Sequence, residues 1–391
     1  AHASMEPLNC GMKLENGECE VWNGEQLHTV DQFSLAKTLG IEADRVKLNM
    51  VYAGGSFGRR ANPQSDYLLE TAQIVKAING RAPVKLVWSR EDDMRGGFYR
   101  PIYLHRVRAA LDAKGMPVAW QQRIVGQSII AGSPFEPMLV KDGVDITSVE
   151  GASTLPYAIP NLNVDLHTTN ADVKVPVQWW RSVGSTHTAY ATELFIDELA
   201  QAAGKDPVAY RMALLKKHPR HAGVLKLAAD KAGWNKPLAP AADGATRGRG
   251  VAVHESFNSF VAEVVEVTVQ KDGSFKVDRV VCAVDCGVVV NPDVVRAQME
   301  GGIGYALAAA LTGSITLKDG VVEQSNFNDY PVLRINEMPK VEVHIVKSAA
   351  KPTGVGEPGV PPLAPALVNA LHAATGKRIR TLPIGEQLQT A

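Results

Sequence analysis

Apolar and polar residues alternate in several short stretches of this chain, and this pattern predicts β-hairpins. Runs rich in β-branched residues, such as 261–269 and 275–284, are joined by a short polar turn that ends in glycine. A hairpin needs such a turn because glycine accepts the left-handed backbone that reverses the chain. We expect turns of this kind at 16–17, 112–115, 270–273 and 317–320.

Other segments carry apolar residues at helical spacing. One stripe, formed by Leu68, Ala72, Val75 and Ile78, follows Asn62-Pro63 and stops at Gly80, which predicts a helix beginning at Pro63. Further helices are expected near 189–203, from Asp206-Pro207 onward, and over 364–375 with Gly376 as the stop. The sequence therefore predicts an α+β fold, with mixed sheets and hairpins packed against helices.

The composition changes between residues 235 and 250, where Pro, Ala, Gly and Arg predominate. Such a stretch is typical of a connection between compact units. We therefore predict a first lobe at 1–235, a linker at 236–250 and a second lobe at 251–391. The length of 391 residues agrees with more than one unit, at roughly 150 residues per domain.

Charge and composition exclude several classes of protein. Lys plus Arg is 41 and Asp plus Glu is 41, so no net charge attracts nucleic acid or an anionic membrane. No uninterrupted apolar run approaches the roughly 18 residues that a membrane helix needs. The four cysteines are too few for a disulfide scaffold, and their spacing matches no iron–sulfur motif. Cys282 and Cys286 are expected to pack within a strand.

The first glycine-rich segment, Gly54 to Arg60, follows the apolar run 46–53. It contains the pattern G-x-S-x-G, which is typical of a hydrolase nucleophile elbow, but there the helix begins at the serine. Here the helix is expected to begin later, which favours a loop whose N–H groups approach an anionic or oxo ligand. A plain turn remains an alternative. So does a serine hydrolase that uses Ser56, with Asp285 and His372 as nominal partners.

Two further segments stand out. Gln178 to Gly184 combines paired tryptophans with Arg181, a pattern that indicates either core packing with a surface cation–π contact or a pocket wall. The segment 354–362 holds three glycines, three prolines and Glu357. Because Pro358 keeps the preceding residue out of the helical region, the Glu357 carboxylate stands on extended backbone. A general base and an ordinary surface glutamate are both compatible with this position.

In their order along the chain, these segments resemble the molybdenum-binding large subunit of the xanthine oxidase family of molybdenum hydroxylases. The likeness is to the branch of the isoquinoline 1-oxidoreductase β-subunit and some bacterial aldehyde dehydrogenases. Each motif is weak alone, whereas the ordered set is specific and covers essentially the whole chain. The matching stretches are 2–7, 54–60, 89–94, 180–184, 298–302, 324–330 and 354–362.

The resemblance implies a molybdopterin cofactor, in its cytosine dinucleotide form, with molybdenum held by the pterin dithiolene and not by protein side chains. Glu357 matches the family's general base, and Ser56 becomes a loop residue. The implied reaction oxidises an N-heteroaromatic or an aldehyde, with water as the oxygen source. The residues expected around the cofactor are Gly55, Ser56, Phe57, Gly58, Trp180, Arg181, Ser182, Gly184 and Gly356.

The resemblance also implies partners. The family's subunit continues on its N-terminal side with a pterin-binding loop, so we expect a second polypeptide or an N-terminal half to supply it. A small subunit with [2Fe–2S] clusters would receive the electrons. A non-catalytic assembly subunit is the remaining alternative. The bacterial cytoplasm is favoured over the periplasm, and neither nucleic acid nor a membrane span is expected.

Overall fold

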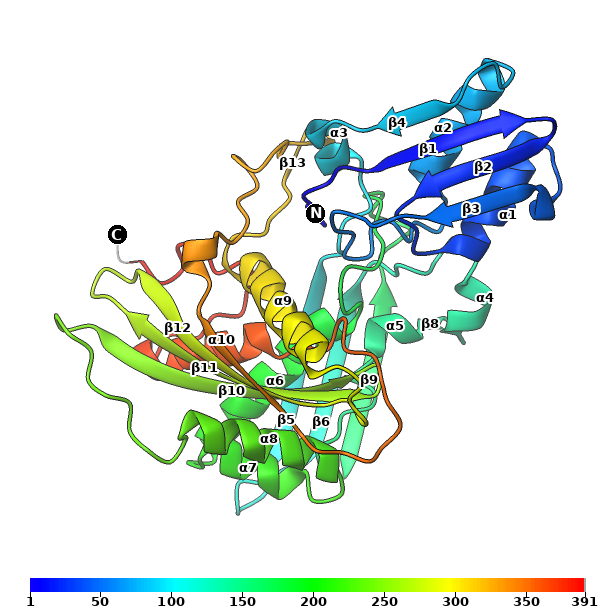
Figure 1. Ribbon diagram of the computed structural model, residues 1–391. Helices are drawn as coiled ribbons and strands as arrows, with labels where there is room; N and C mark the ends of the chain where they lie inside the picture. The colour runs from blue at the N-terminus through cyan, green and yellow to red at the C-terminus, as the bar shows by residue number, and fades with distance from the viewer. Residues whose placement is uncertain (390–391) are drawn as a thin grey trace.

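The computed structural model describes residues 1–389, and its first unit is a four-stranded sheet in the order β3-β2-β1-β4. Helices α1 and α2 cover this sheet (Figure 1). Alternate residues of β1, such as Cys10 and Met12, point into the core against Leu68 and Val75 of α2. The elements are β1 (Asn9–Glu15), β2 (Glu18–Asn23), α1 (His28–Leu39), the 3₁₀ turn Ala43–Arg45, β3 (Val46–Met50), α2 (Asp66–Ala77) and β4 (Val84–Val87).

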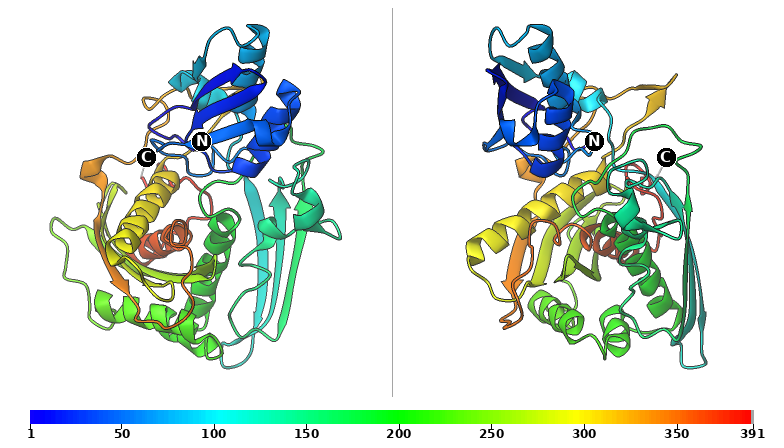
Figure 2. Two further views of the ribbon diagram at one scale, coloured as in Figure 1. Left: turned by 45° about the vertical axis from the view of Figure 1, so that its right-hand side comes forward. Right: turned by 90° about the vertical axis from the view of Figure 1, so that its right-hand side faces the viewer.

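A second, three-stranded sheet has the order β5-β6-β9 and lies along one side of the molecule (Figure 2). Its strands β5 and β6 pair antiparallel, whereas β6 and β9 pair parallel. Short elements connect β6 to β9. The bounds are α3 (Arg90–Arg95), β5 (Tyr103–Leu111), β6 (Pro117–Gly126), α4 (Glu136–Leu139), β7 (Val140–Lys141), β8 (Val144–Asp145), α5 (Ile146–Val149) and β9 (Asn161–Thr168).

The third sheet, β10-β11-β12-β15, forms the centre of the remaining chain. One face packs on α9 and α10 and the other on α8, so its strands are apolar on both sides. The elements are α6 (Ser185–Ala202), α7 (Pro207–Leu214), α8 (Pro219–Ala232), β10 (Thr246–Ser256), β11 (Ser259–Val269), β12 (Phe275–Asp285), α9 (Pro292–Leu311), β13 (Leu317–Lys318), β14 (Val321–Val322), the 3₁₀ turn Ile335–Glu337, β15 (Lys340–Ile345) and α10 (Leu363–Thr375).

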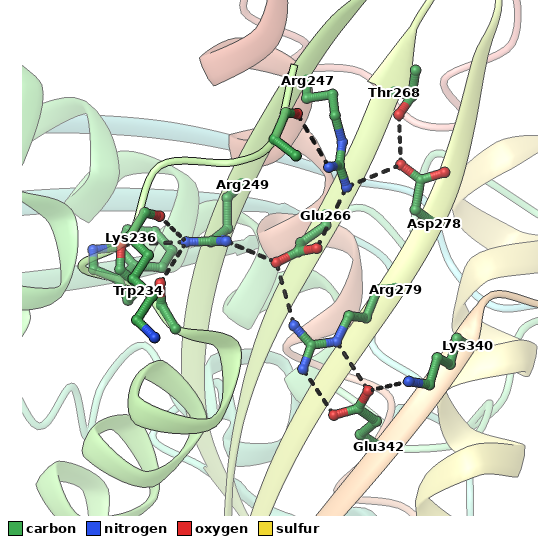
Figure 3. Close-up of polar contacts among 12 residues, drawn as sticks. Trp234, Lys236, Arg247, Arg249, Glu266, Thr268, Asp278, Arg279, Lys340 and Glu342 are labelled. Atoms are coloured by element: carbon green, nitrogen blue, oxygen red, sulfur yellow. Dashed lines mark hydrogen bonds and ion pairs between the residues drawn. The ribbon is translucent and has the colours of Figure 1, made fainter. Parts of the chain in front are cut away.

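A charged cluster fastens the segment after α8 to this sheet (Figure 3). Glu266 of β11 lies at its centre and accepts from Arg249 at 3.0 Å, with Arg279 at 3.5 Å and Arg247 at 3.6 Å. Arg249 also donates to the carbonyls of Gly233, Trp234 and Lys236, which follow α8. Glu266 is buried, and the three arginines offset its desolvation, so the cluster holds the chain in place.

The structure confirms the α+β class and all four hairpin turns. The helix expected from Pro63 begins at Asp66 instead, because residues 62–65 form turns in which the Asn62 side chain accepts from the Gln64 N–H. Strand β10 begins at Thr246, inside the segment expected to be a linker, because residues 246–250 already pair with β11. Cys282 and Cys286 are free and buried; Cys282 lies in β12 as expected, whereas Cys286 follows the end of this strand.

Candidate active site

Three loops that are remote in sequence meet at one place. The first loop (residues 54–60) follows β3, the second (178–184) precedes α6, and the third (354–362) precedes α10. The Arg181 N–H donates to the Phe57 carbonyl at 3.0 Å, and the Arg181 Nε donates to the Gly356 carbonyl at 2.7 Å. The second loop therefore binds both of the others.

The first loop approaches the second so closely that one position tolerates only glycine. Gly58 has φ of +107°, and a Cβ there would lie 2.7 Å from the Trp179 carbonyl oxygen. The Gln178 side chain donates to the Gly58 carbonyl at 2.9 Å, which pins this approach from the other side. Phe57 also has a left-handed backbone, with φ of 55°.

Aromatic rings stack between the first two loops and α9. Tyr305 lies between Phe57 and Trp180, with ring centroids 4.1 Å and 4.5 Å away. The Arg100 guanidinium lies over the outer face of Trp180 at 4.7 Å from the ring centroid. The predicted cation–π contact on the paired tryptophans therefore exists, but Arg100 makes it and not Arg181.

Glu357 stands in the third loop beside open space. Its Oε1 accepts from the Ser182 N–H at 2.9 Å, and its carbonyl accepts from the Ser182 hydroxyl at 2.6 Å. A Cβ on Gly356 would meet no atom within 4 Å, so the neighbouring backbone leaves room for a bound group. The carboxylate is thus fixed by a buried N–H donor while its own residue stays partly exposed.

A second carboxyl group flanks the same turn. Glu150, just after α5, accepts from the Ser185 N–H at 3.1 Å. Burial, with a smaller contribution from the carboxylates of Glu357 and Asp145, raises the pKa of Glu150 to about 7 against the opposing effect of the N–H groups of Ser185 and Gly184. Two carboxyl groups therefore lie on opposite sides of the turn 182–185.

The two arginines of the first loop have structural roles. Arg59 forms an ion pair with Asp66 at 2.5 Å, and Arg60 forms one with Glu6 at 3.1 Å. Both guanidinium groups are buried, so they hold the loop and the N-terminal segment together. These two side chains are therefore engaged within the protein and are not available to a ligand.

The hydrolase alternative is not supported either. The Ser56 hydroxyl bonds the Gln26 side chain and accepts from the Arg60 N–H, and no helix begins at this residue. Asp285 pairs with Arg220 at 2.7 Å, and His372 bonds Gln201 at 3.1 Å. Neither group is bonded to Ser56, so the nominal triad is not assembled.

All the predicted site segments converge, but the sequence did not reveal several neighbours. Tyr305 lies in the middle of α9 with no local motif, and Arg100 and Glu150 lie in irregular segments. Only Gln298, which accepts from Arg181 at 3.0 Å, fell in a stretch noted for its resemblance. No cluster of three or more His, Cys, Asp or Glu is placed to hold a metal ion in residues 1–389.

Two family matches cover most of the chain. Both are to the molybdopterin cofactor-binding domain, over residues 1–215 and 184–339. The chain therefore belongs to the molybdopterin cofactor-binding domain family, and its likeness to the large subunit of xanthine oxidase-type enzymes is confirmed.

Individual relatives refine this placement. The chain is 34% identical to the β-subunit of isoquinoline 1-oxidoreductase from Brevundimonas diminuta, over 98% of this chain and 48% of that protein. It is 29% identical to the membrane-bound aldehyde dehydrogenase (pyrroloquinoline-quinone) of Gluconacetobacter polyoxogenes, over 98% of this chain and 52% of that protein. The chain thus spans about half the length of these relatives.

Solved structures show the same fold at lower identity. Quinoline 2-oxidoreductase from Pseudomonas putida 86 superposes with a TM-score of 0.85 at 14% identity, over 99% of this chain and 74% of that one. At this identity the likeness concerns the fold alone. Among the helices of residues 1–389, none is long and apolar enough to cross a membrane.

Proposed function

We propose that this chain carries the substrate-oxidising site of a molybdenum hydroxylase that acts on an N-heteroaromatic compound or an aldehyde, with water as the oxygen source. The observation that carries the proposal is the position of Glu357. In a molybdopterin cofactor-binding fold, its carboxylate is held by the Ser182 N–H where three loops meet, beside open space at Gly356.

The donor set of these loops fits a molybdopterin cofactor. Glycine backbone allows close approach, and the space beside Gly356 is open to a bound group. When bound, the cofactor would supply a molybdenum centre that accepts two electrons from the substrate. We assign its contacts to the residues expected from the sequence: Gly55, Ser56, Phe57, Gly58, Trp180, Arg181, Ser182, Gly184 and Gly356.

The chain's own residues would move the proton. Glu357 acts as general base, and Ser182 orients it because its N–H reaches only Oε1 and leaves the other oxygen free to accept. Ser182 holds Glu357 at both its carboxylate and its carbonyl, which keeps the base in place for proton transfer. Arg181 ties the third loop to α9 through Gln298, which fixes the distance between base and cofactor loops.

We further propose that the cofactor is the cytosine dinucleotide form, that a small [2Fe–2S] subunit accepts the electrons, and that the assembly resides in the bacterial cytoplasm. A second polypeptide or an N-terminal half would complete the site. The segment that leads from the end of β3 into the first loop supports the proposed second polypeptide. Its apolar residues Met50, Val51 and Tyr52 are 67%, 48% and 103% exposed. Neighbouring exposed apolar side chains are typical of a surface that another polypeptide covers.

Replacing Glu357 by glutamine tests the proposal. Glu357→Gln keeps the acceptor for the Ser182 N–H but removes the proton acceptor, so turnover should fall by about 10²- to 10⁴-fold. Molybdenum content, measured by elemental analysis of the purified assembly, should stay near the wild-type level.

The exposed Glu386, changed to glutamine, is the matched control and should leave turnover unchanged. Near-normal turnover of Glu357→Gln would remove this residue from the mechanism. So would a loss of activity fully explained by lost molybdenum. An assembly that contains no molybdenum at all would instead favour the non-catalytic assembly subunit.

A further inference from the structure

The second loop borders a small cavity of about 10 Å³, close to the space that one water molecule occupies. Its lining includes Arg100, Tyr103, Trp179, Thr186 and His187. None of these residues belongs to the set assigned to the cofactor or to catalysis, although the cavity also borders Trp180 and Gly184.

A chain of hydrogen bonds determines which nitrogen of His187 carries the proton. The Trp120 indole can only donate, and it donates to the Gln122 carbonyl oxygen at 3.1 Å. The Gln122 amide nitrogen therefore donates to His105 Nδ1, at 3.0 Å. A neutral His105 then carries its proton on Nε2 and donates to the Nδ1 of the next histidine, at 3.0 Å. Burial keeps both histidines neutral, because it lowers the pKa of His105 to about 4 and that of His187 well below its ordinary value.

It follows that His187 has its proton on Nε2, and this N–H is buried without a hydrogen-bond partner in residues 1–389. The Trp179 indole N–H is likewise buried and without an acceptor there. Both residues line the same cavity. A buried donor without an acceptor is costly, so two of them at one cavity indicate a missing acceptor.

The charge at the cavity decides what kind of acceptor fits. Arg100 forms no ion pair or hydrogen bond within the described part of the chain, and its guanidinium lies over the Trp180 ring. Burial lowers the pKa of Arg100, and its charge also acts on His187. Water would satisfy the two N–H groups but would leave this cation unneutralised, whereas an anion would satisfy all three.

We propose that this cavity binds a small monovalent anion of halide size, held by Arg100, Trp179 Nε1 and His187 Nε2. The anion would brace the second loop at Trp179. The site is independent of the proposed oxidation, because its ligands take no part in it.

Bromide soaked into crystals of the assembled enzyme provides the test, because its anomalous scattering distinguishes it from water. We expect a bromide peak in the cavity. Trp179→Phe removes one donor while it keeps an aromatic ring, and about tenfold more bromide should then be needed for the same occupancy. Arg100→Gln should abolish the peak.

Trp88→Phe is the matched control, because the Trp88 indole donates to Glu70 in an exposed position outside the cavity. It should bind bromide like the wild type. Wild-type crystals with water density and no anomalous peak would overturn the proposal even if a variant failed to fold. A peak that is unchanged in both Trp179→Phe and Arg100→Gln would also overturn it.

Discussion

Glu150 and Glu357 lie on either side of a single turn, and the two carboxyl groups interact through it. Ser182 donates to one and Ser185 to the other, at 2.9 Å and 3.1 Å. A Cβ on Gly184 would lie 3.2 Å from Glu150 Cγ and 1.7 Å from the Thr147 carbonyl oxygen, so only glycine permits this packing. We infer that Glu150 holds the turn 182–185 in place and that this turn orients Glu357.

The raised pKa of Glu150 predicts a specific pH dependence of stability. Its ordinary value is 4.5 and its folded value about 7, so the folded chain retains a proton that the unfolded chain releases between these two pH values. The contribution of Glu150 to stability is therefore full below pH 4.5 and is lost as the pH rises through about 7. Glu150→Gln, which cannot ionise, should lose less stability over this window than the wild type.

Thermal unfolding midpoints of the assembled enzyme, measured from pH 4.5 to 8, would show this difference as diverging curves. Glu18→Gln, at an exposed position of β2, should run parallel to the wild type. Parallel curves for Glu150→Gln and the wild type would contradict the buried position assigned to this carboxyl group.

At the scale of elements, the close packing of the first loop on the second requires Gly58 and does not require Ser56. Gly58→Val would push a side chain into the Trp179 carbonyl, which also bonds the His2 ring at 2.9 Å. We expect the purified assembly to lose most of its molybdenum. Ser56→Ala removes bonds of a partly exposed hydroxyl and should cost about 1 kcal/mol or less. Retained molybdenum in Gly58→Val together with inactive Ser56→Ala would instead support a hydrolase.

Helix α10 lies directly on β10 because Gly248 and Gly250 of the strand have no side chains to separate the two elements. A Cβ on Gly250 would lie 2.2 Å from the Ala366 carbonyl oxygen and 2.3 Å from the Ala370 nitrogen. Gly250→Ala should therefore lower the free energy of unfolding by about 1–3 kcal/mol.

Gly223, in α8, provides the control, since a Cβ there meets nothing within 4 Å. Gly223→Ala should raise the free energy of unfolding by about 0.5–1 kcal/mol, because alanine loses less conformational freedom in a helix. Chemical denaturation followed by circular dichroism measures both. Equal effects of the two substitutions would contradict the close contact of α10 with β10.

For the whole molecule, the candidate site lies where the first unit meets the two larger cores. The first loop comes from the unit built on β1–β4, whereas the second and third loops precede helices α6 and α10 of the remaining chain (Figure 2). No single unit contains the site. Its geometry therefore depends on the contacts between units, such as the bond from Arg181 N–H to the Phe57 carbonyl.

The proposed second polypeptide leads to a prediction at this scale. Expressed alone, the chain should bind little or no molybdenum cofactor, because part of the site would be open. Co-expression with the segment that corresponds to the other half of its relatives should restore the metal, measured by elemental analysis. Stoichiometric cofactor on the isolated chain would contradict the divided site.

Local sequence determined the hairpins and most helix ends. The turn at 270–273 and the cap Asp206-Pro207 are decided by residues within three or four positions of each other, so their patterns were sufficient. The start of α2 was predicted three residues early because Asn62 uses its side chain in the turn before the helix. The three glycine-rich loops were also found, since their ordered motifs resembled a known family.

Only the tertiary structure decided which residues join those loops. The bonds that unite them span 175 residues, from Arg181 to Gly356, and 120 residues, from Gln178 to Gly58. Contacts over such separations leave no periodic signal in the sequence, because each partner is free to be any residue that fits. Tyr305 reads as an ordinary helix residue until its ring is found between Phe57 and Trp180. The buried donors beside the second loop are recognisable only where packing has removed both water and any protein acceptor.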